Sequence, residues 1–365
     1  FVIFFIFLFI IIILTKNTRL KHIHITDKKL WYANHSVFFI MILGLSVIGI
    51  RGGFQLKPIN LQTATDYTIP KNTPLIINTP FSICLSSTSS ALNKLDYFDD
   101  NEIESLYSPI HKNLIHNRFV KNSSNKNNVV IIILESFGQE MIGFYNKDLK
   151  NSHTPFLDSI LRESLTFDGM SNGRRSIEAL PSILCGLPSL MSTDYPTSRY
   201  AINKVDGLGS IIKKNGYSTA FFHGGNNGTM SFNSTSRSSG FDDYYGRNEY
   251  NNDSDFDGSW GIYDDKFLQF TAKKLKEYEN PFAAVIFTLS SHHPYSLPND
   301  YITSDTTNKT PFEKTITYTD HALKEFFNAI SKEDWFKNTI FIITADHVNP
   351  EHKFDEYKNM FGSYR

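Results

Sequence analysis

The chain has 365 residues, a formal net charge of −1 and a hydrophobic content of 41%. Such a nearly neutral composition offers no electrostatic case for nucleic acid, whose binding depends on an excess of basic groups. The two cysteines, Cys84 and Cys185, are too few for a disulfide framework or a cysteine-rich metal site.

Two apolar runs lie near the N-terminus. Residues 1–14 read FVIFFIFLFIIIIL, and residues 31–50 carry no formal charge besides His35. The first run is shorter than the roughly 20 residues that cross a bilayer. Because the chain begins with Phe and ends within a polar stretch, we expect a fragment that has lost both ends. We therefore predict two transmembrane helices within residues 1–50, the first one truncated. A buried core helix is the alternative for each run, and two successive runs argue against a cleaved signal peptide.

The loop between these runs, residues 15–30, is basic. It contains one acid, Asp27, against five bases: Lys16, Arg19, Lys21, Lys28 and Lys29. By the positive-inside rule this loop is cytoplasmic, so the second helix runs outward. We expect a multi-pass protein of the cell membrane whose residues after Arg51 lie in the periplasm or the extracellular space.

Residues 51–128 form a juxtamembrane connecting region by composition. Within it, residues 92–114 favour one amphipathic helix, and residues 121–128, KNSSNKNN, are typical of a polar linker. Beyond it, residues 129–365 have a different hydrophobic pattern, in which short apolar runs alternate with amphipathic segments. We expect these residues to form an extracytoplasmic catalytic domain that is truncated at its C-terminal end.

The alternation in this domain predicts an α/β fold. The predicted strands are residues 128–134, 217–224, 282–290 and 338–347, and the predicted helices are residues 153–164, 208–216, 264–279 and 311–331. Thr154 is a candidate N-cap followed by Pro155 at the first helical position, and Gly216 is a candidate helix stop. This order predicts a mostly parallel central sheet flanked by helices.

Polar side chains follow three of the predicted strands. Glu135 follows the first strand, His292 and His293 follow the third, and Asp346-His347 ends the last. In parallel sheets the carboxyl ends of the strands meet at one edge, where ligands bind. Two carboxylates and an imidazole suit a divalent cation. Each residue also has an ordinary interpretation, as a solvated loop residue, a helix cap or a surface imidazole.

The stretch SNGRRSIEALPSILCGLP, residues 171–188, offers a hydroxyl for the same site. If Ser176 begins a helix near that edge, its oxygen completes a nearly tetrahedral ligand set, and a metal would lower its pKa and activate it as a nucleophile. The alternative is a plain N-cap. A helix N-terminus favours a phosphate, which Arg174 and Arg175 would contact unless they are only solvated flanks. Cys185 is best interpreted as a small buried hydrophobic residue.

The ordered motifs resemble those of the lipoteichoic acid synthase and phosphoglycerol transferase family, in the alkaline phosphatase and sulfatase superfamily. The resemblance starts near Trp31, and its motifs are VVIIILESFG (129–138), HTPFLDSI (153–160), GRRSIEALPSILCGLPSL (173–190), GFDDYYG (240–246), SWGIYDDKFL (259–268), LSSHHPYSLP (289–298) and TADH (344–347). It implies that one divalent metal, usually manganese with Mg2+ or Zn2+ as alternatives, is held by Glu135, Ser176, Asp346 and His347. It also implies that a histidine contacts the phosphate, for which we favour His292 over His293.

The family mechanism implies that Ser176 attacks the phosphodiester of a membrane phospholipid. Diacylglycerol leaves, and the phospho-group passes from a covalent serine intermediate to a glycan or polymer at the outer surface. Two departures bear on the substrate. Ser176 stands where the synthases have Thr, and the Trp and Arg that bind their substrate are not evident in residues 228–243.

Other functions remain open on the same residues. A phosphoethanolamine transferase or a phosphodiesterase would use the same site. A sulfatase ranks third, because the sulfatase nucleophile signature is absent around Ser176. From a different class, the domain could be a binding or structural membrane protein with a relic metal site, against which the intact set of four candidate ligands argues.

Overall fold

The computed structural model describes residues 9–10, 12–13, 16, 27–55, 58–68, 70–88, 91–93, 95, 97–107, 126–301 and 309–365. The chain divides into two compact units, Phe1–Pro58 and Ile59–Arg365. The second unit contains the sheet and every predicted site residue.

The first unit contains one long helix, α2 (Lys28–Arg51). The Asp27 side chain accepts a hydrogen bond from the Leu30 amide at 3.1 Å, and the helix ends at Gly52, whose φ is +79°. Among the described residues, α2 alone is long and apolar enough to cross a membrane, as predicted for the second apolar run. Residues 1–8, 11 and 14 of the first predicted span lie outside the described part of the chain, as do residues 15 and 17–26 of the basic loop.

The connecting region contains short helices: η1 (Gln62–Asp66), η2 (Pro70–Asn72), α3 (Thr73–Ile76), α4 (Thr79–Thr88) and α5 (Asp100–Leu106). We predicted one amphipathic helix for residues 92–114. In the structure the helix in this range is α5, which is shorter. Residues 108–114 of that prediction lie outside the described residues. The η1 segment lies against α9 (Phe232–Ser238) of the domain, because the side-chain amide of Gln62 donates to Ser238 Oγ at 3.3 Å.

The domain is built on a five-stranded parallel sheet with the order β3-β2-β4-β1-β5. Its strands are β1 (Asn128–Leu134), β2 (Ser218–His223), β3 (Asp243–Tyr245), β4 (Phe282–Phe287) and β5 (Thr339–Ala345). The continuous β-branched and aromatic runs form strands because both faces of a parallel sheet are covered. The predicted parallel α/β fold is therefore confirmed. The sequence patterns had not indicated β3, which has only three residues.

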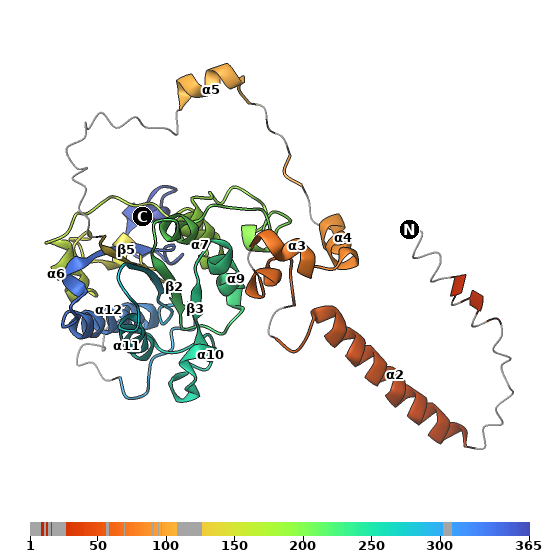
Figure 1. Ribbon diagram of the computed structural model, residues 1–365. Coiled ribbons are helices and arrows are strands. Elements are labelled where there is room, and N and C mark those ends of the chain that lie inside the picture. Colours follow the sequence, from red (N-terminus) through yellow and green to blue (C-terminus); the bar gives the residue numbers. More distant parts are fainter. Residues whose placement is uncertain are drawn as a thin grey trace. The chain divides into compact units, whose positions relative to one another are not determined.

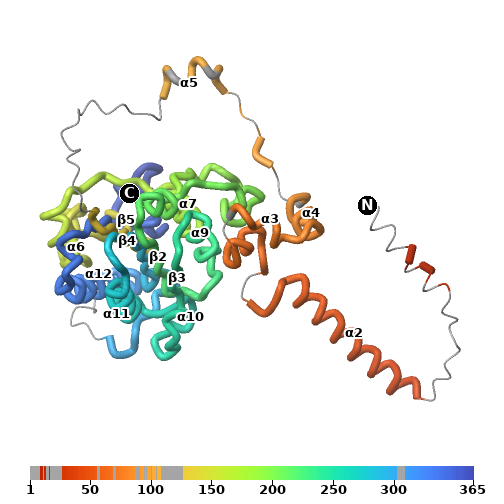
Figure 2. Tube along the Cα trace, viewed as in Figure 1, coloured from red at the N-terminus to blue at the C-terminus, as the bar shows by residue number. Residues whose placement is uncertain are grey.

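Helices cover both faces of this sheet (Figures 1 and 2). The main helices are α6 (Pro155–Leu161), α7 (Ser176–Cys185), α8 (Leu208–Lys213), α9 (Phe232–Ser238), α10 (Arg247–Tyr250), α11 (Asp264–Leu275) and α12 (Pro311–Ile330). The described 3-10 turns of the domain are η3 (Gln139–Met141), η4 (Tyr195–Thr197), η5 (Thr229–Ser231), η6 (Asp253–Asp255), η7 (Phe336–Asn338), η8 (Asp355–Tyr357) and η9 (Gly362–Tyr364).

Successive residues of β1 contribute to two different cores. Val130 and Ile132 pack with α11 and α12 on one face, whereas Ile131 and Ile133 pack with α7 and α9 on the other. Burial on both faces fixes the register of the central strands, since a slip of one residue would exchange the two sets of side chains. The ends of β1 and β5 are thereby held next to each other.

The N-terminus of α6 is capped by a different residue from the predicted Thr154. Thr154 occupies the N-cap position, but its hydroxyl donates to Asp158 Oδ1 at 3.0 Å and caps no helix amide. The amides of Phe156 and Leu157 instead donate to the two carboxylate oxygens of Asp320, at 2.9 and 2.8 Å. Asp320 lies on α12, so the start of α6 depends on a residue distant in sequence.

Candidate metal centre and nucleophile

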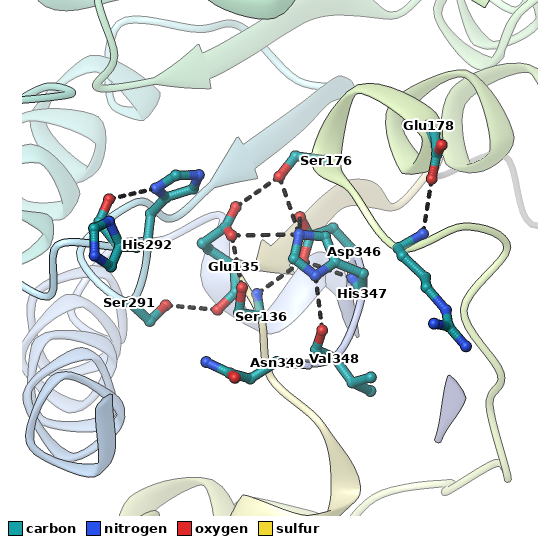
Figure 3. Close-up of polar contacts among 12 residues, drawn as sticks. Glu135, Ser136, Ser176, Glu178, Ser291, His292, Asp346, His347, Val348 and Asn349 are labelled. Atoms are coloured by element: carbon teal, nitrogen blue, oxygen red, sulfur yellow. Dashed lines mark hydrogen bonds and ion pairs between the residues drawn. The ribbon is translucent and has the colours of Figure 1, made fainter. Parts of the chain in front are cut away.

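The four predicted ligands come together at the carboxyl edge of the sheet. Glu135 follows β1, Asp346 and His347 follow the neighbouring strand β5, and Ser176 is the first residue of α7. All four are buried, with exposed fractions of 1%, 1%, 8% and 2%. Figure 3 shows their polar atoms pointing toward one another.

The spacing between their polar atoms is that of ligands around a small cation. Ser176 Oγ lies 2.9 Å from Glu135 Oε2 and 3.3 Å from His347 Nε2. His347 Nε2 also lies 3.5 Å from Glu135 Oε1 and 3.3 Å from Asp346 Oδ2. Four ligands at about 2.1 Å from a tetrahedral ion lie about 3.4 Å from one another. The donor set therefore fits a single divalent cation.

The Asp346 carboxylate supports the same fit. Its Oδ2 is buried and accepts no hydrogen bond from the residues that the structure describes. Burial, and after it the nearby Glu135 carboxylate, raise the pKa of Asp346 well above its ordinary value. Two buried carboxylates this close repel each other unless a proton or a cation lies between them. A divalent cation would satisfy the orphaned oxygen and offset the repulsion.

Three contacts hold Glu135 in place, and a fourth holds Asp346. The Glu135 amide donates to Thr288 Oγ1 at 2.9 Å, and its carbonyl accepts from Ser291 Oγ at 2.5 Å. Ser136 Oγ donates to Glu135 Oε1 at 2.7 Å, and the Ser136 amide donates to Asp346 Oδ1 at 2.8 Å. Ser136 has a φ of +59°, an unfavourable conformation for a residue other than glycine. The strained residue thus orients two candidate ligands at once.

The candidate histidine ligand has a defined tautomer in its neutral form. His347 Nδ1 lies 3.0 Å from the carbonyl oxygen of Val348, which can only accept, so Nδ1 carries the proton and Nε2 presents its lone pair. Burial lowers the pKa of His347, but the carboxylates of Asp346 and Glu135 outweigh burial and raise it overall. The carbonyl contact orients the nitrogen that a metal would need.

The loop before Ser176 is fixed by Glu178, in the first turn of α7. The Glu178 carboxylate accepts from the Arg174 amide at 2.8 Å and from the Arg175 guanidinium at 2.7 Å. Arg175 also forms an ion pair with Asp194 at 2.5 Å. These contacts engage Arg175 with one acid in α7 and one acid beyond it.

The Arg174 guanidinium points to another part of the domain. It donates to Tyr364 Oη at 3.1 Å and lies 4.9 Å from the centre of that ring. Its side chain is exposed, and its guanidinium is directed to Tyr364 and Ser363 and not to the four candidate ligands. Phosphate binding by Arg174 and Arg175 therefore stays a prediction.

The two histidines after β4 differ in position. The His292 ring is partly buried and within electrostatic reach of His347 and Asp346, whereas His293 is exposed and packs edge-on to Tyr295, with ring centres 5.5 Å apart. His292 is also the residue after Ser291, which contacts Glu135 directly. This placement agrees with the preference for His292 as the phosphate contact, a role that stays a prediction.

The other nucleophiles of the α7 stretch face the protein. Ser182 Oγ donates to the Leu187 carbonyl at 2.7 Å, and Cys185 Sγ lies 3.1 Å from Ser239 Oγ. Burial raises the pKa of the Cys185 thiol, which disfavours the reactive thiolate. Ser176 is thus the hydroxyl of α7 that reaches the candidate ligands Glu135 and His347.

Sequence reasoning missed the residues that support the ligands. Thr288, Ser291 and Ser136 orient Glu135, and Trp260 contacts His292 with a ring-centre distance of 4.3 Å. Small hydroxyl residues next to a strand end are common, so their types carry little signal. The Glu135-Ser136 pair at the end of a buried strand was the one available indication.

Comparisons with known proteins identify relatives of this chain. The chain is 26% identical over 253 residues to phosphoglycerol transferase I of Citrobacter koseri, and 24% identical over 230 residues to the lipoteichoic acid synthase-like protein YvgJ of Bacillus subtilis. The alignments cover 64% and 60% of this chain, but 32% and 36% of the relatives. The chain therefore spans about a third of the length of these curated relatives.

Two solved structures have the same fold. A protein of the alkaline phosphatase superfamily from Vibrio parahaemolyticus superposes with a TM-score of 0.57 and 25% identity, over 66% of this chain and 58% of that one. The lipoteichoic acid synthase LtaP from Listeria monocytogenes gives a TM-score of 0.54 and 20% identity, over 65% and 59%. The family described as Sulfatase matches residues 127–360, more than half of the chain, and this range includes all four candidate ligands. The chain thus belongs to the sulfatase family.

Proposed function

We propose that the protein is a metal-dependent transferase that moves a phosphoglycerol-type group from a membrane phospholipid to a hydroxyl of an outer-surface glycan or polymer. The observation that carries this proposal is the position of Ser176. Its hydroxyl begins a helix and lies 2.9 Å from Glu135 and 3.3 Å from His347, two candidate metal ligands. The similarity to phosphoglycerol transferase I supports the choice of transferred group.

In the proposed reaction Ser176 Oγ forms a bond to the phosphorus of the lipid phosphodiester. The bond from phosphorus to the diacylglycerol oxygen breaks, and diacylglycerol leaves with a proton. The acceptor hydroxyl then attacks the same phosphorus, and the bond to Ser176 Oγ breaks. This two-step route explains why a side-chain hydroxyl, and not only water, belongs in the centre.

Each residue has a physical role in these steps. Glu135 Oε2 accepts the Ser176 hydroxyl hydrogen bond and so aims Oγ into the centre. The N-terminus of α7 favours the negative charge of the phosphate that reacts there. A divalent cation held by Glu135, Ser176, Asp346 and His347 would lower the pKa of the serine hydroxyl and offset charge on the phosphate. Manganese is the proposed metal.

The membrane helix suits a lipid substrate. We propose that α2 crosses the cell membrane with Lys28 and Lys29 at its cytoplasmic end, which places the domain in the periplasm or the extracellular space. The diacylglycerol product would then stay in the bilayer, while the phospho-group moves to an acceptor outside the cell.

Diacylglycerol release by the detergent-solubilised protein tests the proposal. The protein with Mn2+ is incubated with phosphatidylglycerol, with phosphatidylethanolamine and with an aryl sulfate in separate reactions. We expect diacylglycerol from phosphatidylglycerol and none from the Ser176→Ala variant. Release from phosphatidylethanolamine alone would instead support the phosphoethanolamine transferase alternative. Cleavage of the aryl sulfate without diacylglycerol release would contradict the transferase proposal and support a sulfatase.

A further inference from the structure

The carbonyl oxygen of His293 accepts two hydrogen bonds, and these determine the state of His292. Trp260 Nε1 donates to it at 2.8 Å, and His292 Nδ1 lies 2.7 Å from it. Because a carbonyl oxygen can only accept, His292 Nδ1 must carry a proton. In the neutral ring, Nε2 then has a free lone pair. Figure 3 shows this second nitrogen on the side of the ring that faces Glu135 and Ser176.

The indole of Trp260 also packs on the His292 ring. The two ring centres lie 4.3 Å apart with an angle of 56° between the planes. Trp260 is therefore bound to the His292–His293 segment twice, through its ring face and through its N–H group. Burial lowers the pKa of His292, which favours the neutral ring.

Trp260 is itself held in a tight turn. Asp257 Oδ1 accepts from the amides of Ser259, Trp260 and Gly261 at 2.8, 2.7 and 3.1 Å. Gly261 forms a bridge to Gly225, just after the end of β2, and a Cβ at Gly261 would lie 2.3 Å from the Gly224 carbonyl oxygen. The indole thus projects from a turn that is anchored to the sheet.

The other side of His292 is anchored to the metal centre. Ser291 Oγ donates to the Glu135 carbonyl at 2.5 Å, and the Ser290 amide donates to Asp264 Oδ2 at 3.0 Å. These contacts fix the backbone on which His292 sits but leave its ring free to rotate. Among the described residues, the ring orientation depends on the His293 carbonyl and on the Trp260 indole.

We propose that Trp260 is a positioning residue that holds His292 in the Nδ1–H tautomer, with Nε2 directed at the reacting phosphate. The inference rests on the proposed function, and it names His292 as the group that accepts and donates the proton in that reaction. When the Ser176 hydroxyl attacks phosphorus in the first step, its proton moves to His292 Nε2 and then to the oxygen of the leaving diacylglycerol. When the acceptor hydroxyl attacks phosphorus in the second step, its proton moves to Nε2 and then to Ser176 Oγ, as the new P–O bond forms and the bond to Ser176 Oγ breaks.

Nitrogen NMR of the protein with 15N-labelled histidine tests the tautomer without any substrate. The Nδ1 and Nε2 resonances of His292 are assigned by their loss in His292→Gln. We expect a protonated Nδ1 and an unprotonated Nε2 in the wild type, and a mixture of tautomers in Trp260→Ala. A protonated Nε2 with a bare Nδ1 in the neutral wild-type ring would overturn the inference.

A double-mutant cycle tests the consequence for turnover. Trp260→Ala should lower kcat about 10- to 100-fold with little change in KM, as part of the about 10²- to 10⁴-fold that general acid–base groups contribute. In the His292→Gln background, Trp260→Ala should have no further effect, because the group it positions is gone. If the two substitutions lowered kcat independently, so that the double variant lost the product of the two single losses, the inference would be overturned.

Two more variants separate positioning from folding. Trp260→Phe keeps a ring on His292 but loses the N–H donor, so its kcat should fall between those of the wild type and Trp260→Ala. Trp335→Phe is the matched control, since Trp335 packs edge-on to Phe282 in the core, with centres 5.3 Å apart. It should alter stability and leave kcat unchanged. Absence of diacylglycerol release by the wild type would count against the proposed function, whereas the NMR result would still decide the tautomer.

Discussion

Ser176 Oγ donates a hydrogen bond to Glu135 Oε2 at 2.9 Å, although the two residues are 41 positions apart in the chain. The contact joins the first turn of α7 to the end of β1. A serine at a helix start is usually only a cap. Here its oxygen points to a buried carboxylate that also faces His347, and this pairing gives the serine its proposed chemical role.

Substitution at Ser176 separates the hydroxyl from its surroundings. Ser176→Ala should reduce kcat for diacylglycerol release by at least about 1,000-fold, as loss of a nucleophile does in other covalent enzymes. Ser176→Thr retains the hydroxyl and should keep measurable turnover. Unchanged release by the alanine variant would show that Ser176 is not the nucleophile.

Two substitutions at Ser136 should distinguish the effect of backbone strain on stability from the effect of the lost hydrogen bond on metal affinity. Ser136→Ala and Ser136→Gly both lose the hydrogen bond to Glu135 Oε1, so each should weaken Mn2+ binding about 10- to 100-fold. The glycine variant alone relieves the φ of +59° and should be about 1 kcal/mol more stable than the alanine variant. Calorimetric titration and thermal unfolding measure the two quantities. Equal stability of the two variants would argue that the backbone at this position is not strained.

Metal binding should release protons. Burial and the Glu135 carboxylate raise the pKa of Asp346, so this group holds a proton that a cation must displace. Mn2+ affinity should therefore increase with rising pH through neutrality and level off once the group is deprotonated. Titration in two buffers with different ionisation enthalpies counts the protons released. An affinity that does not change with pH would contradict the assignment of Asp346 as a protonated ligand in the metal-free state.

The start of α6 should depend on Asp320. Asp320→Ala removes the acceptor of the Phe156 and Leu157 amides and should lower the free energy of unfolding by about 2 kcal/mol. Glu325→Ala, on an exposed position of the same helix α12, is the control and should change it by less than about 0.5 kcal/mol. Denaturant unfolding compares the two. Equal effects would mean that Asp320 does not cap α6.

The cysteines offer a test of membrane topology. Cys84 is exposed, whereas Cys185 is partly buried with its sulfur against Ser239. A membrane-impermeant maleimide should label Cys84 in intact cells if the domain lies outside the membrane, and Cys84→Ser should abolish most of the labelling. Labelling that requires cell lysis would place the domain in the cytoplasm.

Local sequence patterns predicted most of the sheet, for physical reasons. β1 was predicted with its observed bounds because a run of seven residues buried on both faces has few alternatives. Helix ends were predicted less well. The helix expected at residues 264–279 ends at Leu275 in the structure, and residues 276–279 lie in the connection to the next strand. β3 carried no usable signal at three residues in length.

The ligands could be proposed from the sequence, but their supports could not. Glu135 and Asp346-His347 follow strands, and topology alone brings such residues to one edge. Ser291 and Trp260 act through contacts between distant segments, and no spacing in the chain indicates them. The same holds for Arg175, whose ion pair with Asp194 competes with the phosphate contact expected from its position beside Ser176.

A mass measurement on Ser176 tests the central claim most directly. The solubilised protein is mixed with Mn2+ and phosphatidylglycerol in the absence of acceptor, quenched in acid and digested. We predict that the peptide containing Ser176 gains the mass of one glycerophosphoryl group, and that the gain is absent without metal and in Glu135→Gln. Diacylglycerol release without any adduct on Ser176 would contradict the covalent serine mechanism.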